Sequence, residues 1–373
     1  MRWQKLTFDI KAEILSRLPA KSLVRSRCVC KPWLSLLSSP SFIRRHLNRT
    51  TLNPSFDDDD ESFIVLTRPG KGLNEYLSLL QMKNPTVTLN LDHPYPLVWF
   101  VDVVGSINGL VCVGCHRARF FALWNPVTKQ CKKLPHPDLN AHVDDLFVSV
   151  GFCYDALKND YKIVRIVSSE QLNPQTRVEL YATSSNSWRE IVVEDLPFRL
   201  RGIKCDTIVK GEPYWRADLG GVDLTIVWFD AGNEVFRHVP MFGLPLPDSA
   251  VYLVSFKDSL ALAVSRPSIS PGGAVIIDVW MVEEDGFAWS KKYTAGPFED
   301  VWRVEECSRN GLFLEMRVNM NFYCSQTKET KNILSDGGME LRYAQVCNYT
   351  ASLVSIRGYK KVIREDFGWW KKS

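Results

Sequence analysis

The sequence predicts a multidomain protein in which a small all-α unit of three helices precedes a large all-β domain. Two observations lead to this fold class. Apolar residues recur at helical spacing within residues 1–48, whereas from residue 62 onward short β runs alternate with turn residues. The chain of 373 residues, of which 45% are hydrophobic and 24% charged, is long enough to build both parts.

The helical unit is predicted over residues 1–48. One face of its first helix carries four apolar residues, namely Ile10, Ile14, Leu15 and Leu18. Pro19 ends this helix, and Pro32 suits the first turn of a third helix that stops at Ser39-Pro40. The apolar residues of the second and third helices are Leu23, Val24 and Cys28, and then Trp33, Leu36 and Leu37. Because about 50 residues enclose little apolar surface, we expect an apolar face that a partner protein covers.

Residues 49–61 are predicted to form a linker. They are polar, contain Pro54 and end in an acidic run. Consecutive aspartates lack the alternate spacing of a calcium-binding loop, so a solvated spacer is favoured over a calcium site.

A repeated unit organises the β domain, which we place at residues 62–356. In each unit an inner β run precedes a strand with an apolar-aromatic pair, and a polar turn and a further strand follow. Five aromatic residues mark the repeat at intervals of 57, 48, 51 and 43 residues: Trp124, Tyr181, Phe229, Trp280 and Tyr323. A period near 50 with four strands per unit is typical of a kelch-like β-propeller, in which neighbouring blades pack against one another.

The two ends of the β domain predict how the ring closes. The inner runs lie at 109–114, 161–167, 212–218, 259–265 and 311–317. A sixth run at 349–356 has no second half, and the hairpin at 62–67 and 75–80 belongs to no unit of its own. Joining strands from both ends would give about six blades and leave no free edge.

Charge is unevenly distributed along the chain, whose formal net charge is +4. Residues 1–50 hold 11 Lys and Arg against 2 Asp and Glu, and the tail 357–373 holds 6 against 2, which leaves the middle acidic. This division indicates either distinct binding roles or solvated faces without a partner. In the tail, Trp369 and Trp370 could stack on bases, lie at a membrane surface or pack against a blade. Packing is favoured because termini are otherwise disordered, and the acidic middle argues against nucleic acid as a partner.

The sequence contains no convergent catalytic set. The motifs GxSxG, HExxH, GxxxxGK[ST] and GxGxxG are absent, and the six histidines are scattered without ligand spacing. In the run CVGC, a strand would place Cys112 and Cys115 on opposite faces, so neither a redox site nor a zinc site is expected. We therefore predict a protein that is not an enzyme and that needs no cofactor or metal.

The compartment follows from the N-terminus and the cysteines. Asp9 and Glu13 precede any apolar run, unlike in a secretory leader, and no apolar run is long enough to span a membrane. Ten cysteines without an export signal are expected to be reduced thiols. We expect a location in the cytoplasm, the nucleus or both, with no membrane partner.

The run RCVCKPW at residues 27–33 raises the question of a metal site or a docking surface. No second cysteine pair completes a zinc set, and the nearest histidine is His46. Val29, Cys30 and Trp33 are better explained as part of an apolar docking face, in which a buried aromatic residue commonly contributes much of the binding energy. The surrounding basic residues either steer an acidic partner or only keep the surface soluble.

A dense set of residues at the N-terminus resembles the F-box of plant proteins. From Leu6 the chain runs LTFDIKAEILSRLPAKSLVRSRCVCKPWLSLLSSPSF, and the blocks EIL, RLP, KSL, RCVCK and SPSF stand, with Trp33, where the family has them. The remainder resembles the F-box-associated domain of those proteins through SINGL (106–110), LWNPVT (123–128), LP (134–135) and GFCYD (151–155). The two resemblances cover nearly the whole chain.

The resemblance implies a non-catalytic substrate-recognition subunit of an SCF-type E3 ubiquitin ligase. In this family the F-box binds a Skp-family adaptor, which links it to a cullin, and the C-terminal domain captures the protein to be ubiquitinated. Carried onto this sequence, the resemblance assigns nine residues to the adaptor-facing set: Leu6, Ile10, Ile14, Leu15, Leu18, Leu23, Val29, Cys30 and Trp33. Thr7 stands where the family has proline, and its hydroxyl could cap the first helix instead.

Two alternatives remain open at this point: a ligase-independent F-box regulator, and a kelch-type propeller enzyme with a helical appendage. The identity of the target protein is not encoded in any motif. Rigid blades hold variable loops in place, so we expect the target to contact loops. Four ranges are candidates: 199–204, 214–218, 266–273 and 299–303.

Overall fold

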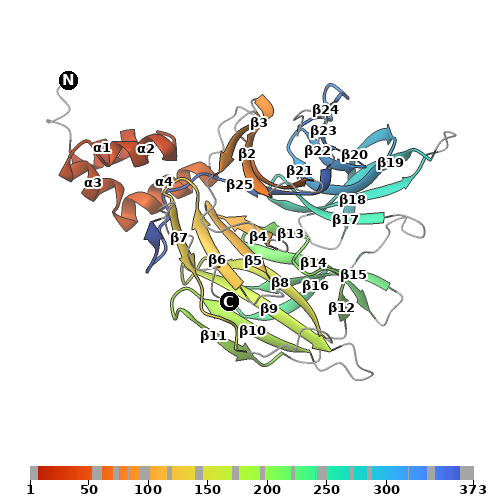
Figure 1. The fold of residues 1–373 in the computed structure, drawn as a ribbon, viewed down its shortest axis with the longest axis horizontal. Helices are drawn as coiled ribbons and strands as arrows, with labels where there is room; N and C mark the ends of the chain where they lie inside the picture. The colour runs from red at the N-terminus through yellow and green to blue at the C-terminus, as the bar shows by residue number, and fades with distance from the viewer. Residues whose placement is uncertain are drawn as a thin grey trace.

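In the computed structural model, a helical unit lies at one side of a ring of small sheets (Figure 1). The structure describes residues 7–52, 61–69, 75–82, 84–91, 101–115, 120–138, 146–169, 176–193, 198–219, 223–239, 241, 250–268, 273–283, 288–317, 319–333 and 341–361. An all-α unit followed by an all-β domain is the fold class that the sequence predicts.

The helical unit has four helices within the described residues: α1 (Phe8–Leu15), α2 (Ala20–Ser26), α3 (Lys31–Leu37) and α4 (Pro40–Leu52). The prediction of three helices was one short, because Ser39-Pro40 both ends α3 and begins α4. Proline fits the first turn of a helix, and Ser39 Oγ accepts a hydrogen bond from the Phe42 N–H at 3.3 Å. Helix α4 therefore continues into the start of the expected linker, and residues 53–60 lie outside the described residues.

The predicted cap of the first helix is present. Thr7 Oγ1 accepts a hydrogen bond from the Ile10 N–H at 3.4 Å, while the Thr7 backbone is extended as an N-cap requires.

Five of the six sheets are built from consecutive strands, and we number these blades 1 to 5. Blade 1 contains β4 (Asp102–Ile107), β5 (Leu110–Cys115), β6 (Phe120–Asn125) and β7 (Gln130–Lys133). Blade 2 contains β8 (Leu146–Asp155), β9 (Asp160–Ser169), β10 (Arg177–Ala182) and β11 (Ser187–Ile191). Blade 3 contains β12 (Phe198–Leu200), β13 (Thr207–Val209), β14 (Glu212–Leu219), β15 (Asp223–Asp230) and β16 (Val235–Val239). Blade 4 contains β17 (Ala250–Phe256), β18 (Ser259–Pro267), β19 (Val275–Val282) and β20 (Trp289–Phe298), and blade 5 contains β21 (Val301–Ser308), β22 (Gly311–Met316), β23 (Met320–Cys324) and β24 (Thr330–Asn332).

The sixth blade closes the ring with strands from both ends of the β domain, as predicted. It contains β25 (Leu341–Tyr349), β1 (Ser62–Pro69), β2 (Tyr76–Gln81) and β3 (Asn84–Leu91), in that order. The antiparallel pairing of β25 with β1 begins at Ser62 opposite Tyr349. The expected closing run at 349–356 was wrong, because the closing strand ends at Tyr349 and residues 350–356 pair with no strand.

The sequence predicted four strands per blade but located only three of them. The inner runs form the second strands, for example β5, β9 and β18, and each is preceded in its sheet by a strand that no predicted run covers. The five aromatic markers all lie on the third strand of their blades, β6, β10, β15, β19 and β23. Four of them are buried, and Trp280 is half-buried. The repeat was therefore correctly identified, although the position of one of the four predicted strands per unit was not.

The CVGC run lies in β5 and places its two thiols on opposite faces, as predicted. Cys112 is in the apolar cluster between blades 1 and 2, whereas Cys115 is in the cluster between blades 1 and 6.

Of the C-terminal tail, β26 (Lys360–Lys361) pairs with Gln130 and Cys131 at the outer edge of blade 1. Trp369 and Trp370 lie outside the described residues.

Candidate docking site

The propeller covers one side of the helical unit. The core of this unit contains Leu15 and Leu23 together with Leu353, which belongs to the segment 350–356 that follows β25. Ile43 and Leu47 of α4 pack on the cluster between blades 1 and 2. The helical unit and the propeller thus share one continuous set of apolar contacts.

Asn125 holds the segment 350–356 on blade 1. Its Nδ2 donates hydrogen bonds to the carbonyl oxygens of Ser352, at 3.2 Å, and of Val354, at 2.8 Å. Ser352 Oγ donates to the carbonyl of Asn108 at 2.5 Å, beside Gly109, whose φ is +79° and where a Cβ would collide with Ser352. The runs SINGL and LWNPVT therefore position the segment that carries Leu353 into the helical unit.

The helical unit also presents large apolar side chains to solvent. Five residues of α1–α3 and their connections are between 39% and 66% exposed: Ile10, Ile14, Leu18, Val29 and Leu34. We call these five residues the apolar stripe. Cys30 is exposed next to Val29, and the basic residues Lys21, Arg25 and Lys31 are exposed around it. This arrangement suits an apolar contact with a polar rim.

The structure separates the nine residues that the sequence assigned to adaptor binding. Ile10, Ile14, Leu18, Val29 and Cys30 are exposed, and Trp33 is half-buried against the helical core. Leu15 and Leu23 are only 2% and 0% exposed, so they hold the helices together and do not face outward. Leu6 lies outside the described residues.

Leu34 belongs to the exposed set and was missed from the sequence. In α3 the residues Trp33, Leu36 and Leu37 form the face that packs inward, and Leu34 lies off that face. An apolar residue outside the inward-facing pattern of a short helix was the available signal.

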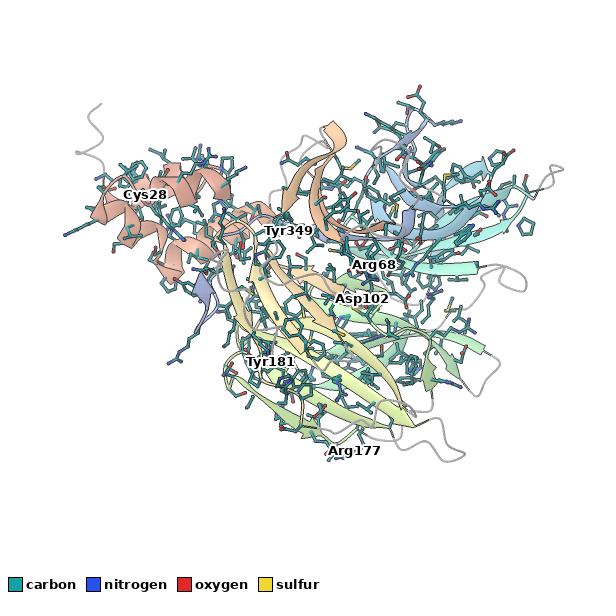
Figure 2. All side chains as sticks on the ribbon, in the orientation of Figure 1. Cys28, Arg68, Asp102, Arg177, Tyr181 and Tyr349 are labelled. Carbon is teal, nitrogen blue, oxygen red and sulfur yellow. The ribbon has the colours of Figure 1, made fainter. Side chains whose placement is uncertain are left out.

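A second candidate surface lies at the channel enclosed by the innermost strands. The end of β25 at Tyr349 leads into the segment 350–356, which carries Leu353 into the helical core, and Asn108 after β4 accepts a hydrogen bond from Ser352 of the same segment. We call the opposite end of the channel, where β4, β21 and β25 start, the free mouth. In Figure 2, Tyr349 lies between Cys28, which is in the connection of α2 and α3, and the pair of Arg68 and Asp102 at the free mouth. Arg68 forms ion pairs with Glu75 at 3.0 Å and with Asp102 at 3.1 Å.

Inside the channel is a cavity of about 40 Å³. Its polar and charged lining comes from four inner edges: Ser106, then Lys204, Asp206 and Thr207, then Glu306, and then Gln345 and Asn348. The Glu306 carboxylate accepts hydrogen bonds from the N–H groups of Ser255 and Cys307, each at 3.0 Å. Burial nevertheless raises the pKa of Glu306 to about 7.

The four ranges expected to contact a target differ in structure. Residues 214–218 lie within β14 and are not a loop, so this expectation was wrong. Residues 199–204 contain the last two residues of β12 and the four residues that follow it. Residues 299–303 contain a bend at 299–300 and the first three residues of β21. Residues 269–272 of the remaining range lie outside the described residues.

Among the residues that the structure describes, no three His, Cys, Asp or Glu side chains are arranged so that they could hold a metal ion, on either surface. Cys28 and Cys30 are both exposed free thiols. No described helix combines the length and the apolar character needed to cross a membrane.

Comparison with known proteins agrees with the two-part architecture. Residues 3–45 match the family model described as the F-box domain, and residues 77–356 match the F-box associated beta propeller domain. An F-box/kelch-repeat protein of Arabidopsis thaliana is 28% identical, with 86% of this chain and 88% of that protein covered. An F-box protein of the same plant is 28% identical, covering 83% of this chain and 80% of the relative. Porphyromonas gingivalis dipeptidyl peptidase 4 superposes with a TM-score of 0.32 at 8% identity over 73% of this chain and 50% of that chain, a likeness that carries no argument about function.

Proposed function

Because this chain belongs to the F-box proteins with an F-box associated β-propeller domain, we propose that it is the substrate-recognition subunit of an SCF-type E3 ubiquitin ligase. The helical unit binds a Skp-family adaptor and, through it, a cullin. The propeller captures a target protein, and other subunits carry out ubiquitin transfer. The cytoplasm and the nucleus are the proposed sites of action.

The apolar stripe is the observation that carries this proposal. Leu353 and the propeller cover part of the helical unit, yet Ile10, Ile14, Leu18, Val29 and Leu34 stay exposed. Several large apolar side chains exposed on one small unit are typical of a protein contact site. The proposed adaptor surface is therefore this stripe with Cys30 and the edge of Trp33, while Leu15 and Leu23 support it from inside.

The test is a pull-down of the full chain with a Skp-family adaptor. Leu18→Asp and Val29→Asp each place a carboxylate in the proposed contact without disturbing a buried position, so we expect adaptor binding to weaken about 10-fold or more. Leu157→Asp is the control, because Leu157 is an apolar residue on the propeller that is 96% exposed and lies outside the proposed contact. Binding that both stripe variants retain at the level of the control would contradict the proposed surface.

Cullin association separates the proposed function from its rivals. If the wild-type chain brings cullin down together with the adaptor, the ligase role is supported. Adaptor binding without cullin would favour a ligase-independent F-box regulator. Absence of adaptor binding altogether would leave the propeller enzyme with a helical appendage as the alternative to pursue.

A further inference from the structure

Three aromatic residues lie near the starts of neighbouring innermost strands at the free mouth. They are Tyr252 of β17, Trp302 of β21 and Tyr343 of β25. The guanidinium of Arg216 lies over the Tyr252 ring at 5.8 Å, and that of Arg68 lies over the Tyr343 ring at 4.8 Å. Trp302 is 64% exposed, and no cation from the described part of the chain lies over its ring. Trp302 is therefore the aromatic residue of this set that is open to a cation from another molecule.

The backbone of β21 is irregular where Trp302 stands. The register between β21 and β22 shifts between Val301 and Arg303 and again between Val304 and Glu306. Trp302 and Glu305 are thus the extra residues of two bulges in one innermost strand. Bulges re-aim side chains and are frequent beside binding sites. Here they set an exposed indole next to Arg303, the residue that lies opposite Glu315.

Carboxylates outnumber cations behind Trp302. Arg303 Nε lies 2.8 Å from Glu305 Oε1, and Arg216 is engaged by Asp206 at 2.9 Å. No Lys or Arg among the described residues lies within 4.0 Å of the Glu315 carboxylate, which accepts a hydrogen bond from the Ala344 N–H. Burial, and then the charge of Glu305, raise the pKa of Glu315 to about 7. Arg303 interacts with both Glu305 and Glu315, and Lys204 interacts with both Glu305 and Glu306, so these two cations serve three carboxylates.

The cavity deeper in the same channel offers polar atoms that lack a partner within the described residues. Gln345 is 3% exposed, and its Oε1 accepts a hydrogen bond from the Val103 N–H, but its Nε2 has no acceptor. Thr207 is 5% exposed, and its Oγ1 is likewise unpaired. Both residues line the cavity. Buried polar atoms are nearly always paired, so this cavity is suited to polar atoms from a ligand or from bridging water.

We propose that the free mouth binds a lysine or arginine side chain of the target protein, with Trp302 as the cation–π face and Glu315 as the counter-charge. The proposal rests on the proposed function, since it names the chemistry by which the propeller would recognise a target. The occupant is a basic side chain on an exposed segment. A positively charged side chain of the target would complement the exposed Trp302 ring and the Glu315 carboxylate, which has no cation within 4.0 Å among the described residues.

The test measures binding of the full chain to fluorescein-labelled glycine–serine peptides that carry several arginines, several lysines or, as a neutral twin, several citrullines. We expect the basic peptides to bind more tightly than the citrulline peptide. Trp302→Ala and Glu315→Gln should each weaken binding of the basic peptides about 3- to 30-fold, while Trp302→Tyr should retain most of it. Glu329→Gln is the control, because Glu329 is an exposed carboxylate in the connection before β24.

Two outcomes would overturn the inference: equal binding of arginine and citrulline peptides, or equal weakening by Glu329→Gln and Glu315→Gln, which would indicate nonspecific attraction. Adaptor pull-down with the same variants keeps this test separate from that of the proposed function. Normal adaptor binding without a preference for basic peptides would remove the inference alone. A preference for basic peptides without any adaptor binding would remove the ligase proposal alone.

Discussion

At the residue scale, several of the residues by which the chain resembles its family hold distant segments of the chain together. Asn125 bridges blade 1 and the segment 350–356, and Gly109 supplies the left-handed turn on which Ser352 rests. Asp155 is buried and accepts from Lys162 at 3.0 Å. The sequence could show that these residues form motifs. It could not show their partners, because Ser352 and Val354 are more than 200 residues away from Asn125.

The sequence predicted only part of the candidate adaptor surface, because it could not separate exposed from buried apolar residues. Ile14 and Leu15 are adjacent on α1, yet Ile14 is exposed and Leu15 is buried. In a unit this small, apolar residues are needed both for the internal core and for the outer contact, and both sets follow the same helical spacing. Spacing therefore identified the helix but could not decide which apolar residues face a partner.

Glu306 makes stability depend on pH. Because burial raises its pKa to about 7 in the folded chain, the folded state holds this proton more tightly than the unfolded state does. Its contribution to stability is full below the unfolded pKa of about 4.5 and is lost as pH rises through about 7. Glu306→Gln keeps the neutral form at all pH values. We expect the variant to gain stability relative to wild type between about pH 5 and pH 8, on the order of 1 to 3 kcal/mol.

Urea unfolding midpoints of wild type and of Glu306→Gln, measured at about pH 5 and at about pH 8, quantify this gain in stability. The groups that face Glu306 are Ser255 of β17, Lys204 of the inner edge of blade 3, and the thiols of Cys307 in β21 and Cys347 in β25. Glu329→Gln, at an exposed carboxylate, should leave the difference between the pH values unchanged. A Glu306→Gln variant whose midpoint follows wild type at both pH values would show that the carboxylate is solvated in the folded chain.

At the element scale, polar contacts between blades complement the apolar ones. Lys162 of β9 is buried, and its Nζ donates to Asp155 at 3.0 Å, to the Ala231 carbonyl at 2.7 Å and to Glu234 at 3.0 Å. The last two acceptors lie in the turn between β15 and β16, so this ammonium joins blade 2 to blade 3. Strand positions were readable from the aromatic repeat, but a buried lysine between blades was not, because lysine usually marks an exposed position.

Lys162→Met should therefore destabilise the propeller. The change keeps the aliphatic volume but leaves the buried Asp155 carboxylate without its buried counter-charge, at a cost on the order of 3 to 5 kcal/mol. Lys158 also pairs with Asp155, at 3.4 Å, but its side chain is mostly exposed, so Lys158→Met should cost less than about 1 kcal/mol. Denaturant unfolding monitored by tryptophan fluorescence compares the two. Equal costs for both variants would mean that the contact between blades contributes little.

At the scale of the whole molecule, the sequence predicted the ring and its closure but not how the helical unit attaches to it. The repeat of aromatic residues and the unpaired runs at both ends sufficed to predict about six blades closed by strands from both ends, although the closing run was placed at 349–356 and not at β25. The attachment depends on residues 350–356, which look like a strand in the sequence because Leu353 and Val354 are apolar neighbours. In the structure Leu353 enters the helical unit and Val354 enters the cluster between blades 1 and 2, so the segment serves two cores at once.

Leu353→Asp tests whether the helical unit depends on the propeller. A carboxylate at this buried position should disrupt the helical core, because Leu353 packs among residues of α1–α4 and has no charged partner there. Hydrogen exchange of the full chain should then show loss of protection in residues 7–52, with the blades protected as in wild type. Ser355→Asp is the matched control, since Ser355 is exposed in the same segment and should change neither part. If the helices kept their protection in Leu353→Asp, the helical unit would be stable without the segment, and the orientation of the proposed adaptor surface relative to the free mouth would not be fixed by this contact.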